Sequence, residues 1–89
     1  MSEITLTVHH QVGLHARPAA LFVQIAKQFK CNIMVAHDER QANAKSILGV
    51  LTLGASQGAV ITIRAEGEDA DQALAALETL VENNFGEES

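Results

Sequence analysis

The sequence predicts an α+β fold: an open-faced β-sandwich in which a four-stranded antiparallel sheet is covered on one face by three helices. Segments with apolar residues at every second position alternate with segments whose apolar residues recur at helical spacing, in the order β-α-β-β-α-β-α. The strands are only half apolar, so one sheet face should contact water and the other should pack against helices. A length of 89 residues fits a single domain over residues 1–89.

The first strand and the first helix come early in the chain. Residues 3–8 alternate between polar and apolar, which is typical of a half-buried strand. From Ala16 onward the apolar residues follow a helical period. Pro18 fits only the first turn of a helix, where an amide hydrogen would have no partner within the helix. The helix should therefore begin close to His15 and run to about residue 28.

The middle of the chain predicts three strands and a short helix. Residues 32–37 form a strand, and a turn leads from it into a short polar strand at 40–43. Ser46 is the N-cap of a short helix that Gly54 should end. Another strand follows at 59–65. Residues 46–63 carry no charge, but small and polar residues in their middle favour two short elements over a membrane span.

Residues 66–85 contain the clearest helix. Asp69 is a candidate N-cap, and Gln72 stands three residues further on, as in a capping box. The apolar stripe of this helix consists of Ala70, Ala73, Leu74, Leu77, Leu80 and Val81.

Composition limits the class of protein. The only cysteine, Cys31, can form neither an intramolecular disulfide nor a cysteine-based metal site, which fits a cytoplasmic protein. Residues 2–11 lack the continuous apolar core of a signal peptide. Residues 1–65 hold all six Lys and Arg and three of the eleven acidic residues, whereas residues 66–89 hold eight acids and no base. The first part therefore suits a phosphate or an acidic protein, and the acidic balance of −5 argues against nucleic acid.

His15 and Arg17 stand where the first helix should begin. The backbone N–H groups of Ala16 and Arg17 would have no acceptor within the helix, and with the helix dipole they would attract an anion. The Arg17 guanidinium adds a cation that can bind phosphate oxygens. A neutral imidazole is a nucleophile at physiological pH, so these residues could form and stabilise a phosphohistidine. Two alternatives stay open: His15 as a simple cap or surface residue, and a small ligand-binding domain with a fortuitous "HARP".

Two motifs carry a family resemblance. "GLHARPA", the element order, and "KSILGVLTLG" about thirty residues later resemble the histidine-containing phosphocarrier (HPr) family of the bacterial sugar phosphotransferase system. The resemblance implies that His15 accepts a phosphoryl group on Nδ1 from phospho-Enzyme I, which phosphoenolpyruvate has charged, and donates it to a histidine of an Enzyme IIA domain. Arg17 would be the cation beside the phosphate. The chain would then be a monomeric, stoichiometric carrier without cofactor, metal or membrane insertion, rather than an independent enzyme.

Ser46 leads to a second functional reading. A phosphate there would gain from the helix dipole and from Lys45, and similar family members carry a regulatory phosphoserine placed by an HPr kinase/phosphorylase. The chain could instead be a regulatory paralogue, either in a nitrogen branch or as a Ser46-controlled partner of a transcription regulator. The partner-binding residues that the resemblance implies are Ala20, Ile47, Leu48 and Leu51.

The surface around these residues departs from many relatives, which have a bulky apolar residue at position 20 and a basic one at 24 or 49. Ala20, Gln24 and Gly49 make it less bulky and less basic. A short helix can turn only part of its apolar set outward, so we expect some of these residues to be core.

The remaining histidines predict no metal site. His9 and His10 are adjacent, so in strand geometry they would point to opposite faces and could not hold one ion together. His37 should lie at a turn.

Overall fold

The computed structural model describes residues 2–9, 16–83 and 85. It contains the predicted elements in the predicted order. These are β1 (Ser2–Thr7), α1 (Ala16–Ala26), β2 (Asn32–His37), β3 (Arg40–Asn43), α2 (Ile47–Thr52), β4 (Val60–Glu66) and α3 (Ala70–Glu82). The predictions for His10 and His15 concern residues outside this range.

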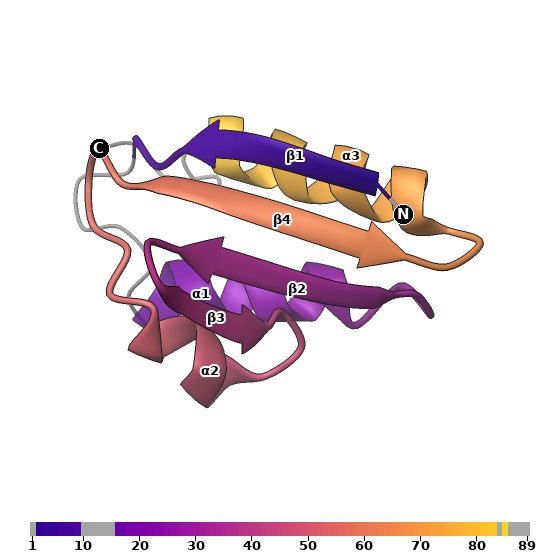
Figure 1. Cartoon of the computed structure of the whole chain (residues 1–89), viewed down its shortest axis with the longest axis horizontal. Coiled ribbons are helices and arrows are strands. Elements are labelled where there is room, and N and C mark those ends of the chain that lie inside the picture. The colour runs from indigo at the N-terminus through magenta and orange to yellow at the C-terminus, as the bar shows by residue number, and fades with distance from the viewer. Residues whose placement is uncertain (1, 10–15, 84, 86–89) are drawn as a thin grey trace.

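The four strands form one sheet in the order β1-β4-β2-β3, with every neighbouring pair antiparallel. The helices lie on one face of this sheet (Figure 1). Ile63 in the central strand β4 faces Ile4 of β1 on one side and Val35 of β2 on the other. This register places apolar side chains of three strands in one row on the helix side, because residues directly opposite one another share a face.

The two faces of the sheet differ as the alternation predicts. On the helix side Ile33, Val35 and Ile63 are almost completely buried. On the other side Met34 remains 39% exposed and Arg64 is exposed. The predicted open-faced α+β sandwich is therefore confirmed.

Helix α1 packs through its predicted apolar positions, since Phe22, Val23 and Ala26 are buried. The helix ends at Ala26, slightly earlier than predicted. The N–H groups of Gln28 and Phe29 donate to carbonyls three residues back instead of four, which tightens the chain into a turn. Phe29 is only partly buried as a result of its place beyond the helix.

Helix α3 confirms its stripe, which is buried except at the half-buried Leu80. The predicted capping box is wrong. Asp69 occupies the N-cap position, but its side chain makes no capping hydrogen bond. Its carboxylate instead accepts the backbone N–H groups of Lys30 and Cys31, at 2.8 and 2.9 Å. These amides belong to the turn before β2, so the carboxylate joins two segments that are distant in sequence.

No helix in the described part of the chain is long and apolar enough to span a membrane.

Candidate functional site

The first turn of α1 carries the described part of the predicted phosphate site. Ala16 and Arg17 are its first two residues, and both are exposed. Their N–H groups lie in the part of a helix that has no intrahelical acceptors. Pro18 and Ala19 are buried directly behind them. The exposed turn is thus attached to a helix fixed in the core. His15 precedes it in the chain and lies outside the described residues.

Ser46 is the N-cap of α2, as predicted. Its backbone is extended, with φ −110° and ψ 115°, and its Oγ accepts the N–H of Gly49 at 3.1 Å. The residue is exposed. Gly49 fits closely here, because a Cβ at this position would lie 3.1 Å from the Cβ of Ala42 and 3.3 Å from the Ser46 Oγ. A larger residue at 49 would therefore press on both the cap and the sheet.

Lys45, the cation expected to stabilise a phosphate on Ser46, binds the end of α1 in this structure. Its Nζ donates to the carbonyl oxygen of Phe29 at 2.7 Å, in the turn that ends α1. Its backbone N–H donates to the Asn43 side-chain oxygen at 2.9 Å. The ammonium thus satisfies a carbonyl near the negative end of α1.

Helix α2 divides its apolar residues between core and surface, as expected. Val50 and Leu53 are buried, whereas Leu48 is 73% exposed. Ile47 and Leu51 are exposed by 38% and 37%. These three form the exposed apolar face of α2. Exposed apolar residues gathered on one short element are typical of an interaction surface.

A hollow of about 530 Å³ lies between α1 and α2. Its lining includes Ala20, Gln24, Lys27, Ser46 and Leu48. The structure therefore brings the predicted partner-binding residue of α1 next to Ser46 and to α2. Leu51 does not line this hollow.

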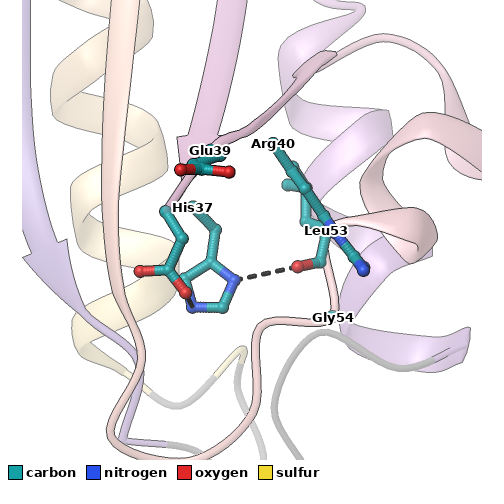
Figure 2. A pocket seen from close by; sticks show the side chains of 6 residues that line it. His37, Glu39, Arg40, Leu53 and Gly54 are labelled. Atoms are coloured by element: carbon teal, nitrogen blue, oxygen red, sulfur yellow. Dashed lines mark hydrogen bonds and ion pairs between the residues drawn. The ribbon is translucent and has the colours of Figure 1, made fainter.

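The C-terminal end of α2 contacts two side chains that the sequence did not connect with this helix. Figure 2 shows the His37 Nδ1 directed at the carbonyl oxygen of Leu53, at 2.8 Å. The Arg40 Nη1 donates to the carbonyl oxygen of Thr52 at 2.9 Å. His37 is the last residue of β2, beside the turn where it was expected. Only the pairing of β2 with β3 and the return of the chain through α2 bring these residues together, so no local sequence signal could reveal them.

The titratable groups considered next, all within the part of the chain that the structure describes, form no reactive centre. Burial raises the pKa of the Cys31 thiol, and the nearby Asp69 carboxylate raises it further. This thiol therefore lacks the thiolate character of a nucleophile. His9 is exposed beyond the end of β1. Within residues 2–9, 16–83 and 85, no group of three His, Cys, Asp or Glu side chains is placed to hold a metal ion.

Comparison with known proteins identifies the family. A family model described as "PTS HPr component phosphorylation site" matches residues 2–83. The chain belongs to the HPr family. HPr proteins are phosphocarriers of the phosphotransferase system, and the match runs through both motifs that carried the resemblance.

Individual HPr relatives match along the whole chain. The phosphocarrier protein HPr of Xylella fastidiosa is 47% identical over 89 residues, which is 100% of both chains. The crystal structure of an HPr from Thermoanaerobacter tengcongensis superposes with a TM-score of 0.97 at 50% identity, covering 100% of both chains.

A regulatory relative also matches. A structure of Crh, the catabolite repression protein of Bacillus subtilis, has a TM-score of 0.75 at 40% identity and covers 94% of this chain and 97% of its own. It is described as a dimer with a swapped domain.

Proposed function

We propose that this HPr-family chain accepts a phosphoryl group on His15 from phospho-Enzyme I and passes it to Enzyme IIA components during phosphoenolpyruvate-dependent sugar uptake. The observation that carries the proposal is the phosphorylation-site family match over residues 2–83, which includes "GLHARPA". It is supported by the exposed first turn of α1, where Ala16 and Arg17 offer N–H groups and a guanidinium to an anion.

In the proposed step, the lone pair of His15 Nδ1 attacks phosphorus while the bond between phosphorus and Enzyme I breaks. The electrons of that bond return to Enzyme I. The Arg17 guanidinium and the first-turn N–H groups stabilise the negative charge on the transferring phosphoryl oxygens. Because these groups lie at an exposed helix end, the same turn can present the phosphoryl group to the next acceptor.

The proposed docking surface combines α1 and α2. It consists of Ala20, Ile47, Leu48 and Leu51. Their exposure beside the hollow between the two helices supports this role. Ala20 is half-buried, so most of the accessible apolar area comes from α2.

The rest of the proposal follows from a carrier role. Residues 1–89 act as one HPr-like domain, as a stoichiometric carrier rather than a catalyst, and without a cofactor. Phosphoryl transfer takes place in the cytoplasm, where phosphoenolpyruvate phosphorylates Enzyme I.

The direct test incubates the purified chain with Enzyme I and labelled phosphoenolpyruvate. We expect a label that is labile in acid and stable in base, as a phosphoramidate is. His15→Ala should abolish labelling, whereas the matched control His9→Ala should retain it. Labelling of His15→Ala to the wild-type level would refute the assignment.

A regulatory role of Ser46 is the second candidate function. It is favoured by the likeness to Crh and by the exposure of the Ser46 side chain at the start of the proposed docking surface. The presence of His15 favours the carrier, because a purely regulatory homologue could dispense with it.

The Ser46 proposal is tested with an HPr kinase and ATP, followed by mass mapping of the modified peptide. Phosphate on Ser46, and none on Ser46→Ala, is the expected result. Ser56→Ala serves as the control for an exposed serine elsewhere. No phosphate on Ser46 under saturating kinase would remove this role.

A further inference from the structure

Helix α2 needs anchors from the rest of the molecule. It has six residues, and an isolated helix of that length is unstable in water. Within the helix only Val50 is buried, and Leu53 is buried just after it. The orientation of its exposed apolar face therefore depends on how its two ends are held.

The carbonyl groups at the C-terminal end of α2 show where the anchors are. Val50 and Leu51 accept backbone N–H groups at 3.2 and 3.5 Å, which are long hydrogen bonds. The next two carbonyls, of Thr52 and Leu53, accept side chains from Arg40 and His37 at 2.9 and 2.8 Å. Within the helix, the Thr52 hydroxyl donates to the Gly49 carbonyl oxygen at 2.7 Å. The last two carbonyls, of Thr52 and Leu53, are thus bonded by side chains from outside the helix.

Both anchoring side chains come from paired positions of two neighbouring strands. His37 and Arg40 face each other in the antiparallel pairing of β2 with β3. They lie two residues from Val35 and Ala42, which are buried on the helix side of the sheet, so all four share that side. Strand β2 is also paired with β4 in the middle of the sheet. The end of α2 is therefore bonded to strands of the sheet rather than to another loop.

The chemistry of the two anchors suits a helix C-terminus. A carbonyl oxygen can only accept, so the His37 Nδ1 must carry the hydrogen that lies between them. The Arg40 guanidinium is a permanent cation at the negative end of the helix dipole. In Figure 2 both side chains flank Leu53 and Gly54, where the chain turns away with a φ of +66° at Gly54.

We propose that His37 and Arg40 are positioning residues for partner docking: they anchor the C-terminal end of α2 and so present Ile47, Leu48 and Leu51 as a preorganised surface. This inference rests on the proposed function and adds residues outside the proposed docking surface to it. A preorganised surface binds more tightly because less conformational freedom is lost on association. The His37 side chain is only 18% exposed and points at Leu53, so its effect is transmitted through α2.

The test measures phosphoryl transfer from phospho-Enzyme I as a function of carrier concentration, well below the midpoint of thermal unfolding. His37→Gln and Arg40→Leu should each raise KM about threefold, and the double variant about tenfold, with kcat unchanged. His37→Asn should restore the wild-type KM, because its amide N–H lies near the position of Nδ1, whereas the glutamine amide lies nearer that of Nε2. Gln41→Ala, beside Arg40 but on the open face of the sheet, is the matched control and should leave KM unchanged.

Hydrogen exchange of the backbone amides gives the second measurement. The Leu53 and Gly54 amides should exchange several-fold faster in His37→Gln and Arg40→Leu, while amides of α3 remain protected. Faster exchange of the Leu53 and Gly54 amides with an unchanged KM would overturn the proposal, as would an equal KM for His37→Asn and His37→Gln. Unchanged hydrogen exchange in the variants would refute the proposal that His37 and Arg40 anchor α2. A wild-type chain that accepts no phosphoryl group would refute the proposed function but not this anchoring.

Discussion

Asp69 stands where the sequence predicts a helix cap, but its carboxylate binds the backbone of the turn before β2. The hydrogen bonds from Lys30 and Cys31 lower the pKa of Asp69 below its ordinary value of 3.8, with the Lys30 N–H as the largest cause. A lowered pKa means that the folded state favours the charged carboxylate. The contribution to stability is therefore present above the pKa of the unfolded chain and is lost as the pH falls through the lower, folded value.

This linkage predicts how Asp69→Asn behaves. At neutral pH the variant should be less stable than wild type, and the difference should shrink as the pH falls below the unfolded pKa of the carboxyl group. Urea unfolding at a series of pH values measures it. Glu68→Gln, which removes a neighbouring exposed carboxylate, is the matched control. A gap between wild type and Asp69→Asn that stays constant into strong acid would contradict the explanation.

Gly67 lies three residues before α3 and is the second residue of this region that contacts the turn before β2. Its φ is +145°, and a Cβ there would lie 2.8 Å from the Cβ of Cys31. Gly67→Ala should therefore destabilise the fold by about 2–4 kcal/mol, from backbone strain and overpacking together. Gly58 also has a positive φ, of +87°, but a Cβ would meet nothing within 4 Å. Gly58→Ala should cost only about 1 kcal/mol, and equal losses in thermal or urea unfolding would show that the contact with Cys31 is unimportant.

At the scale of elements, the six residues of α2 include some that stabilise the fold and others that are exposed for partner binding under the proposed function. Its N-terminus is capped by Ser46, one face is held by Val50, and its C-terminus is tied to the β2–β3 pair. The opposite face is left to solvent. Residues of similar chemistry in this helix should thus have unlike effects when replaced.

Leu48 and Leu53 make that contrast measurable. Leu53→Ala removes a buried side chain and should destabilise the protein by about 2–5 kcal/mol. Leu48→Ala removes an exposed one and should change stability by less than about 0.5 kcal/mol. Under the proposed function, Leu48→Ala should nevertheless raise KM for phospho-Enzyme I. Equal stability losses, or an unchanged KM for Leu48→Ala, would contradict this division of the helix.

At the scale of the whole molecule, the periodic patterns sufficed for the elements and the fold class. Alternation located the strands within a residue or so, and helical spacing identified the buried faces of α1 and α3. Local chemistry also identified the Ser46 cap. The pattern could not reveal contacts between segments that meet only in the folded chain. Two such contacts are the hydrogen bond from the Lys30 N–H to the Asp69 carboxylate and that from the Lys45 ammonium to the Phe29 carbonyl oxygen. For the candidate site, the roles of Arg17 and Ser46 stay predictions, and the sequence did not point to the side chains that bind the end of α2.

The association state is also a property of the whole chain. We expect a monomer, with a mass near 9.5 kDa in light scattering across a range of concentrations. The Crh relative, described as a swapped dimer, represents the alternative outcome. Twice the monomer mass at all concentrations would contradict the expectation.

Under the proposed function, His15 carries a transferable phosphoryl group. The most direct measurement follows the chain by phosphorus NMR with catalytic Enzyme I and phosphoenolpyruvate, and then after addition of Enzyme IIA. We expect one phosphohistidine signal that couples to the His15 ring, is absent in His15→Ala and disappears as Enzyme IIA becomes phosphorylated. A phosphorus signal that persists unchanged in His15→Ala, or none in the wild-type chain, would contradict it.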